Sequence, residues 1–480
     1  MIDYITDTSK GVIEKKRRYK PLFHFSPRKG WINDPNGLVK IDDGYRLFAQ
    51  HNPYQPVWGP MHWLDIRSND LIKFEESDRY ALKPDKDYDQ KFGCFSGSSI
   101  IKDGKLWLMY TGASEEKQVQ CLAVEEGDGF KKIDSNPVLD ENELPSTYMI
   151  KDFRDPKVIW VNGMYYCFLA TRKVAGHSSI VLFKSEDLIS WKFVKSVLES
   201  EDFNSEMFEC PDIVRVGDKD LLMFSIQGFG GIEGRLVNKN NVLGCIGKMN
   251  FEKGVFTPLS KWRPVDDGFD FYATQTSYSK DDNPLLISWM NAWGSKDYTG
   301  ENEGWSGRFT LPRFLSVDKN NRFIQTFSTE LDKYECEFIK SKKIEEINEY
   351  SKDNPREFLD INLELDKKNL EDLLIGLNCG EEKVELSVEN DMLKVDRSNC
   401  FNKITTETKI DDFVRYAELD KSKDTLKLRI VIDVTSVEIQ IDDGYSMMSL
   451  NFYPKIPDYS LSIENNDSDS LLECDIKTNK

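Results

Sequence analysis

Residues 31–37, Trp-Ile-Asn-Asp-Pro-Asn-Gly, place a carboxylate between two amides on a short and rigid stretch of chain. The proline that follows Asp34 disfavours a helical conformation at that residue, and the closing Asn-Gly pair favours a turn with positive φ. Considered alone, such a turn is typical of a surface loop. The aromatic residues around it, Phe25 and Trp31, favour a buried frame instead. Asp34 is therefore a candidate reactive carboxylate, provided that other acids join it.

Further polar motifs recur at intervals of about 60 residues through the first two thirds of the chain. They are centred on Asp34 itself, Ser96 in Phe-Ser-Gly-Ser, Asp155 in Arg-Asp-Pro, Glu209 in Phe-Glu-Cys-Pro-Asp, and Tyr272 in Asp-Phe-Tyr-Ala. Taken singly, each motif could be structural: a turn, an ion pair or a strand end. Gathering three carboxylates in one place is costly unless chemistry requires it. The common spacing therefore predicts one shared site.

Two carboxyl groups acting together are the apparatus of glycoside cleavage. One attacks the anomeric carbon or activates water, and the other protonates the departing oxygen. The acid must keep its proton near neutral pH, which requires burial or a neighbouring carboxylate to raise its pKa. Glu209 has the apolar neighbours Phe208 and Cys210 that favour this. Asp34, among amides, is better suited to remain ionised as the nucleophile.

The elements that must position these residues are short β-strands. Five β-rich runs follow the polar motifs, at 45–50, 106–110, 164–169, 221–225 and 285–289, most of them preceded by an Asp-Gly or Asn-Gly turn. Their spacing of about 60 residues suits a blade of four strands with its turns. The pattern predicts a five-bladed β-propeller, in which the polar motifs converge at one end of the central axis.

The last third of the chain differs in composition. From about residue 335, charged stretches alternate with strands such as 383–388, and 425–440 reads as one long alternating segment. This pattern is typical of a two-sheet sandwich with one buried face per sheet. We therefore predict an all-β protein with an N-terminal extension (1–20), a five-bladed propeller (21–333) and a C-terminal β-sandwich (334–480).

The overall composition excludes several classes of function. The 480 residues include 83 acidic and 64 basic ones, which gives a formal net charge of -19. Such a surface repels a phosphate backbone, so we expect no nucleic-acid partner. The N-terminus is polar, and no apolar run resembles a signal peptide or reaches the length of a membrane span. We expect no membrane association and a cytoplasmic location.

Cysteine and histidine usage argues against metal and acyl-transfer chemistry. Nine cysteines are scattered without CxxC pairs, which favours reduced thiols and no structural zinc. The four histidines form no HExxH motif, and no GxSxG nucleophile motif is present. We expect neither a metal ion nor an organic cofactor. The sequence assigns no oligomeric state.

Together these motifs resemble glycoside hydrolase family 32, the β-fructofuranosidases, which include invertases and sucrose-6-phosphate hydrolases. The matching segments are 31–37, Gln50 with 52–53 and 58–59, 95–98, 154–156, 209–212, 270–276, and 304–307 leading to 311–313. The resemblance covers about residues 20 to 330, with a weaker continuation in the last third. It implies a five-bladed propeller, a following β-sandwich, and a retaining double displacement on a sugar substrate.

The resemblance also implies a role for each motif residue. Asp34 would be the nucleophile, Glu209 the acid/base and Asp155 the stabiliser of the transition state, with Arg154 beside it. Positions that contact or frame the fructosyl unit are Trp31, Asn33, Gln50, Trp58, Phe95 and Ser96, and weaker candidates for the pocket rim are Tyr272, Trp289 and Trp305. These last three could instead be core aromatics. Retention predicts carboxyl groups of Asp34 and Glu209 about 5 to 5.5 Å apart.

Two departures from the family pattern bear on substrate preference. The second motif is followed by His-Trp-Leu-Asp at 62–65 where many relatives have Trp-Gly-His, and Phe208 stands where Trp is common. The expected substrate is sucrose 6-phosphate or sucrose. The alternatives are an exo-acting fructan or fructo-oligosaccharide hydrolase, or a fructosyltransferase that uses the same residues. A sugar-binding protein without turnover is disfavoured because all three acids are present.

Overall fold

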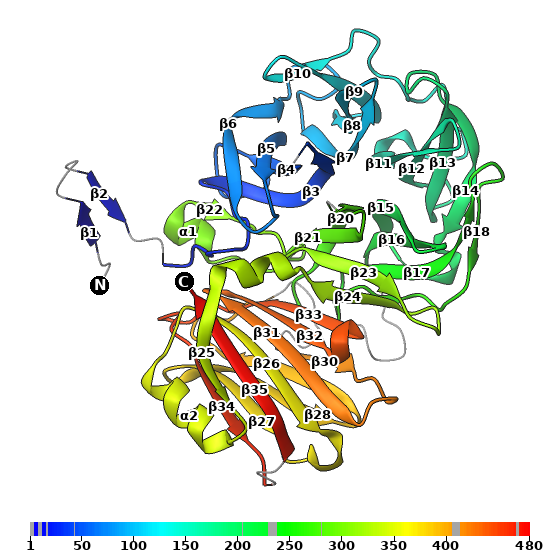
Figure 1. The fold of residues 1–480 in the computed structure, drawn as a ribbon. Helices are drawn as coiled ribbons and strands as arrows, with labels where there is room; N and C mark the ends of the chain where they lie inside the picture. The colour runs from blue at the N-terminus through cyan, green and yellow to red at the C-terminus, as the bar shows by residue number, and fades with distance from the viewer. Residues whose placement is uncertain are drawn as a thin grey trace.

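The computed structural model describes residues 4–7, 12–15, 18–42, 44–203, 205–228, 238–279, 281–405, 413–466 and 470–480. Figure 1 shows two β-rich domains in contact, a ring of small sheets and, below it, a pair of larger sheets. Of the predicted N-terminal extension, β1 (Tyr4–Asp7) and β2 (Val12–Lys15) pair as an antiparallel hairpin. Much of the rest of that extension lies outside the described residues.

The first domain consists of five antiparallel sheets. Blade 1 holds β3 (Gly30–Ile41), β4 (Gly44–Asn52), β5 (His62–Ser68) and β6 (Phe74–Leu82); blade 2 holds β7 (Gly93–Lys102), β8 (Lys105–Ala113), β9 (Gln118–Glu126) and β10 (Gly129–Lys132); blade 3 holds β11 (Arg154–Val161), β12 (Met164–Arg172), β13 (Ser178–Ser185) and β14 (Lys192–Glu199). Blade 4 holds β15 (Met207–Val216), β16 (Lys219–Gln227), β17 (Asn241–Asn250) and β18 (Val255–Pro258), with β19 (Arg263–Pro264) beside β17; blade 5 holds β20 (Tyr272–Tyr278), β21 (Pro284–Trp289), β23 (Arg313–Val317) and β24 (Phe323–Phe327).

The five sheets close into a ring. Their innermost strands β3, β7, β11, β15 and β20 each contact the next, and β20 returns to contact β3. Closure is completed by β22 (Trp305–Ser306), which pairs in parallel with Gly30 and Trp31 of blade 1. The predicted five-bladed propeller is confirmed. The five apolar runs of the sequence are the second strands of the blades, which are almost wholly buried because neighbouring blades cover both faces.

Each innermost strand carries an irregularity at the position of its polar motif. The pairing register shifts between Ile32/Pro35, Phe95/Gly97, Arg154/Lys157, Glu209/Asp212 and Tyr272/Gln275. In three blades a non-glycine residue there has positive φ: Asp155 at 63°, Cys210 at 46° and Ala273 at 55°. A bulge of this kind re-aims side chains away from the ladder. The five bulges thus explain how the side chains of the polar motifs turn out of their strands toward one shared axis.

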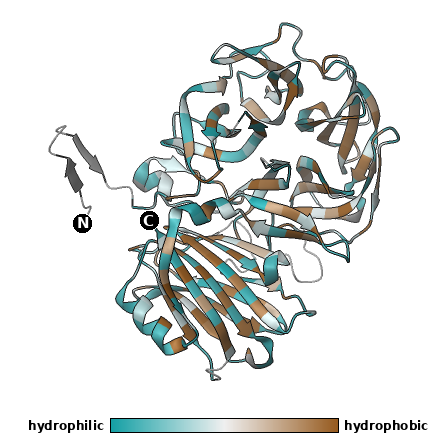
Figure 2. Cartoon of the chain, in the orientation of Figure 1, coloured by the Kyte–Doolittle hydropathy of each residue, from teal (hydrophilic) through white to brown (hydrophobic). Residues whose placement is uncertain are grey.

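The second domain is a sandwich of two antiparallel sheets. The six-stranded sheet runs β25 (Glu335–Ser341), β35 (Leu471–Asn479), β26 (Phe358–Asp366), β31 (Thr425–Asp433), β32 (Ser436–Ile441) and β33 (Ser446–Asn451); the five-stranded sheet runs β30 (Val414–Glu418), β29 (Met392–Asn399), β28 (Glu382–Glu389), β27 (Leu374–Cys379) and β34 (Ser460–Glu464). Hydrophobic and hydrophilic residues alternate along many of these strands (Figure 2). One face of each sheet therefore supplies the core, as the alternation predicted.

Short helices complete the described chain. They are α1 (Thr299–Glu303), which precedes β22, and α2 (Ile344–Asp353), which packs against β25 and β34, together with 3-10 turns at Ile150–Asp152, Ser200–Asp202, Thr329–Tyr334, Lys367–Asn369 and Asp442–Gly444. The all-β class is confirmed. The domain junction predicted at residues 333 and 334 falls at the end of the turn Thr329–Tyr334 and stays a prediction.

Buried ion pairs join the two domains. Arg313 Nη2 of the propeller donates hydrogen bonds to Glu438 Oε2 of the sandwich at 2.5 Å and to Asp266 Oδ2 at 2.9 Å. His24 Nδ1 lies 2.8 Å from Asp433 Oδ2, and its Nε2 lies 3.0 Å from Glu438 Oε1. All these side chains are fully buried. A buried charge without its partner is strongly destabilising, so this network holds the domains in one relative placement.

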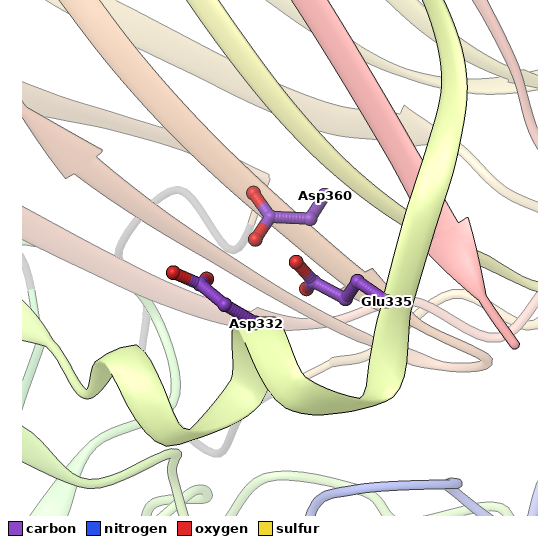
Figure 3. A group of neighbouring side chains, drawn as sticks. All are labelled: Asp332, Glu335 and Asp360. Carbon is purple, nitrogen blue, oxygen red and sulfur yellow. The ribbon is translucent and has the colours of Figure 1, made fainter.

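A second group of acids lies where the chain enters the sandwich. Asp332, Glu335 and Asp360 point their carboxyl groups toward one another (Figure 3). The guanidinium of Arg429 contacts both Asp332 and Asp360, whereas neither oxygen of Glu335 accepts a hydrogen bond. Lys477 Nζ is 3.6 Å from Glu335 Oε2. Burial, followed by the charge of Asp360, raises the pKa of Glu335 to about 8.

Candidate active site

A cavity of about 370 Å³ opens at the end of the propeller where the polar motifs meet. Its walls come from blades 1 to 4 and from the segment after β21, and the lining residues are Asn33, Asp34, Gln50, Trp58, Phe95, Ser96, Gln118, Asp152, Arg154, Asp155, Glu209, Gln227 and Trp293. The structure therefore brings together all three predicted acids. They come from three different blades, so only the closed ring assembles them.

Asp34 is held by donors from three directions. Ser96 Oγ donates to Asp34 Oδ2 at 2.5 Å, and Asn33 Nδ2 donates to Oδ1 at 3.0 Å. The Cys210 thiol lies 3.5 Å from Oδ2. Burial raises the pKa of Asp34 to about 6, with the hydrogen bond from Ser96 opposing this and the charge of Glu209 adding to it. Asp34 is thus mostly ionised at neutral pH, although its pKa is higher than its amide neighbours in the sequence suggested.

Glu209 has polar surroundings, contrary to the expectation from its neighbours in sequence. Arg154 Nη2 donates to Glu209 Oε1 at 2.8 Å, while Tyr272 Oη and Gln227 Nε2 each donate to Oε2 at 2.7 Å. Phe208 instead points into the apolar core between blades 3 and 4. Successive strand residues alternate between faces, so Phe208 lies on the face of the strand opposite Glu209. The other flank, Cys210, contacts Asp34 and Asp155 in the site itself.

Asp155 interacts electrostatically with both of the other acids. Its Oδ2 accepts a hydrogen bond from the Cys210 amide at 2.9 Å, and Arg154 Nε is 3.8 Å away. Burial raises the pKa of Asp155 to about 7; Arg154 opposes the shift, and the charges of Glu209 and Asp34 add to it. Burial also raises the pKa of the Cys210 thiol far above its ordinary value, so Cys210 stays a neutral group between Asp155 and Asp34.

Most of the other predicted residues line the same cavity. Asn33, Gln50, Trp58, Phe95, Ser96 and Arg154 all contribute to its wall. Gln50 is fixed by a hydrogen bond from its Nε2 to the Cys94 carbonyl at 2.8 Å. Trp58 is 43% exposed and packs edge-on against Phe95 at a centroid distance of 6.3 Å. These two rings form an apolar edge beside the carboxylates, an arrangement suited to a sugar.

Four predicted aromatics lie elsewhere than on the cavity wall. Trp31 and Trp289 pack behind Trp293, with Trp289 to Trp293 centroids 5.0 Å apart, and Tyr272 reaches the site only through its hydroxyl on Glu209. Trp305 is fully buried with Tyr19 and Tyr453 at the domain junction. The expectation that Trp305 lies at the rim is thus corrected: strand β22 closes the ring, which turns this side chain away from the cavity.

Sequence reasoning missed four lining residues: Gln118, Asp152, Gln227 and Trp293. The two glutamines stand at the ends of strands β9 and β16, outside the spaced motifs. Asp152 lies two positions before Arg154 and contacts it at 3.7 Å, so an extended reading of that motif could have found it. Gln118 and Gln227 carried no signal in the sequence, because only the blade geometry brings strand ends to the cavity.

No group of acids in this cavity meets the geometry of a metal site within the described ranges, where the sole match is Asp332, Glu335 and Asp360 in the sandwich. There the guanidinium of Arg429 already serves as the cation for two of the three carboxylates. Among the residues that the structure places, no helix is long and apolar enough to cross a membrane.

Comparison with known proteins agrees with this arrangement. The domain description "Glycosyl hydrolases family 32 N-terminal domain" matches residues 24–326, and "Glycosyl hydrolases family 32 C terminal" matches residues 330–478. A sucrose-6-phosphate hydrolase of Escherichia coli is 32% identical over 93% of this chain and 91% of its own length. A raffinose invertase of Escherichia coli is 30% identical over 94% and 93%.

Solved structures show the same two-domain architecture. The β-fructofuranosidase of Bombyx mori superposes with a TM-score of 0.81 at 26% identity, covering 97% of this chain and 94% of that one. The sucrose-6-phosphate hydrolase of Lactobacillus gasseri gives a TM-score of 0.84 at 24% identity, again covering 97% and 94%. At 24% identity, the comparison with the Lactobacillus gasseri structure shows a shared fold only.

Proposed function

The chain belongs to glycosyl hydrolase family 32 and is a β-fructofuranosidase, and we propose that Asp34, Glu209 and Asp155 carry out its reaction as a retaining double displacement. The observation that supports this most directly is the convergence of these three carboxyl groups, from three blades, on one cavity. Two carboxyl groups acting on opposite sides of a glycosidic bond are the minimum for such a reaction.

In the first step Asp34 attacks the anomeric carbon of the fructosyl unit. The bond from that carbon to the leaving-group oxygen breaks, and Glu209 transfers its proton to this oxygen. In the second step water attacks the fructosyl ester on Asp34, Glu209 takes the proton of the water, and fructose leaves with Asp34 again ionised. The pKa of about 6 keeps Asp34 mostly ionised at neutral pH, as an attacking group requires.

Asp155 and Arg154 have the supporting role in this proposal. Asp155 is fixed by the Cys210 amide, so its free oxygen can bind fructosyl hydroxyl groups and offset positive charge at the anomeric carbon. Arg154 contacts both Glu209 and Asp155 and so connects the proposed acid/base with the proposed stabiliser. Asn33, Gln50, Trp58, Phe95 and Ser96 would frame the sugar, with Trp31 and Trp289 as support behind Trp293.

The stereochemistry of the first product tests the mechanism. We expect NMR of the freshly hydrolysed substrate to show β-fructofuranose before mutarotation, since two inversions at one carbon restore its configuration. Release of the α-anomer first would contradict the assignment of Asp34 as a nucleophile. The reaction needs no metal or organic cofactor in this proposal.

The proposed substrate is sucrose 6-phosphate, after the name of the Escherichia coli hydrolase reported above, or sucrose. Specificity constants on both sugars, on an inulin-type oligosaccharide and on a levan-type one would test it. A higher constant on either fructan would favour the exo-acting alternative instead. We also propose a cytoplasmic location, in keeping with nine cysteines that form no disulfide, and a propeller and sandwich at 21–333 and 334–480.

A further inference from the structure

We propose that Gln227 is a positioning residue for Glu209, and that the proton which Glu209 delivers to the leaving group resides on Oε2, the oxygen that Gln227 contacts. This inference rests on the proposed function, because it takes Glu209 as the acid/base. The proposal adds Gln227, a residue outside the spaced motifs, to the site. It also distinguishes the two oxygens of Glu209, because only Oε2 carries the transferred proton.

The strand geometry places Gln227 beside Glu209. In blade 4, β15 pairs with β16 so that Met207 faces Gln227 and Glu209 faces Ser225. Gln227 is therefore the diagonal neighbour of Glu209 on the same face of the sheet, within reach of a long side chain. Its Nε2 donates to Glu209 Oε2 at 2.7 Å. Gln227 lines the cavity beside Glu209, so the contact lies at the cavity wall.

The partners of the two oxygens differ in kind. Glu209 Oε1 accepts from Arg154 Nη2 at 2.8 Å and from Nε at 3.3 Å. A guanidinium can only donate hydrogen bonds, so it opposes a proton on Oε1. Oε2 accepts from the Tyr272 hydroxyl and the Gln227 amide. A hydroxyl and an amide each offer an acceptor as well, so both partners of Oε2 can adapt when it carries a proton.

Of these two adaptable partners, Gln227 is the one that faces the substrate. Tyr272 is 1% exposed and is absent from the cavity wall, so it holds Glu209 from behind. Gln227 is half-buried and contributes to the wall. When Oε2 donates its proton to the leaving-group oxygen, the Gln227 amide can return to the donor arrangement of the structure. The amide thus stabilises each protonation state without adding a charge.

The experiment compares two leaving groups in the variant Gln227→Leu. Sucrose requires protonation of its departing oxygen, whereas p-nitrophenyl β-D-fructofuranoside releases a stable phenolate without it. We expect kcat on sucrose to fall roughly 10-fold to 100-fold, the effect of one hydrogen bond to a charged group. On the aryl substrate we expect kcat within about 3-fold of wild type. Retained turnover of the aryl substrate also shows that the variant is folded.

Gln118→Leu is the matched control. Gln118 is the other glutamine of the cavity, and its Oε1 accepts from Arg154 Nη1 at 3.4 Å without contacting Glu209. We expect any loss in this variant to be similar for the two substrates. Equal losses on both substrates in Gln227→Leu would overturn the positioning role. Failure of the proposed acid/base role of Glu209 would look different, because Glu209→Gln itself would then lose similar activity on the two substrates.

Discussion

Ser96 Oγ of blade 2 lies 2.5 Å from Asp34 Oδ2 of blade 1, so the proposed nucleophile is hydrogen-bonded across a blade boundary. The contact depends on the bulges in β3 and β7, which turn both side chains toward the axis. A short hydrogen bond to a carboxylate stabilises its ionised form. Ser96 therefore offsets part of the burial that raises the pKa of Asp34.

The variant Ser96→Ala should raise the pKa of Asp34 above its value of about 6. Activity requires the ionised carboxylate, so kcat/KM falls as the pH drops through this pKa. We expect the acidic limb of the pH profile of kcat/KM to lie near pH 6 in the wild type and to move to higher pH in the variant. An unchanged acidic limb would show that another group, such as Asp155, controls it.

Replacement of Asp34 by Asn should abolish turnover, with a loss of roughly 1,000-fold or more, because an amide cannot form the fructosyl ester. The protein should remain folded, since Asn keeps the shape of the side chain and a hydrogen-bonding oxygen for Ser96. Thermal unfolding and sucrose turnover are the two measurements. A variant that keeps a tenth of wild-type activity would exclude Asp34 as the nucleophile.

Glu209→Gln should impair poor leaving groups much more than activated ones. The amide cannot donate the proton that sucrose needs, whereas nitrophenolate leaves without it. Sodium azide, which needs no general base to attack, should accelerate the second step of the variant on the aryl substrate and yield fructosyl azide. Comparable losses on both substrates, together with no response to azide, would argue against an acid/base role.

His24 should make the stability of the domain junction depend on pH. Burial lowers its pKa, but the hydrogen bonds and charges of Asp433 and Glu438 raise it to about 8. Because the folded-state pKa exceeds the unfolded value, this stabilisation is complete below about pH 6.5 and is lost as the pH rises through about 8. The shift corresponds to about 2 kcal/mol. Denaturant unfolding of wild type and His24→Gln between pH 6 and 9 would measure it, and the variant should lose most of this dependence.

Glu335 should destabilise the protein as the pH rises. The pKa of this acid is raised from 4.5 to about 8, so the folded state binds a proton that the unfolded chain releases. The penalty grows from about pH 4.5 and levels off above pH 8. Glu335→Gln removes it, so the variant should unfold at higher denaturant concentration than wild type at pH 9. Equal midpoints at pH 9 would mean that Lys477 and Arg429 already compensate the charge.

The spacing of motifs predicted much of this structure because a propeller repeats one unit around an axis. Asp34, Asp155 and Glu209 occupy equivalent points of blades 1, 3 and 4, so their regular spacing along the chain predicted that they meet in space. The sandwich was predictable for a related reason. Alternating strands such as β31 expose one face and bury the other, and this period is visible in the sequence.

The rest depended on contacts between segments far apart in the chain. The polar environment of Glu209 comes from Arg154, Tyr272 and Gln227, none of which is adjacent to it in sequence. Local neighbours therefore suggested an apolar setting. Trp305 belongs to a motif shared with the family, but its strand pairs with blade 1 and its side chain packs at the domain junction. A motif can mark ring closure as well as a binding site.

Ring closure by β22 also imposes an order of events on biosynthesis. Asp34 lies on β3, and β3 gains its second neighbouring strand only when residues 305 and 306 pair with residues 30 and 31. A ribosome releases the strand of the proposed nucleophile about 270 residues before it releases the strand that completes its sheet. Until residue 306 has been made, the blades of a growing chain can form at most an open arc, so the closed ring that surrounds the cavity cannot exist before then.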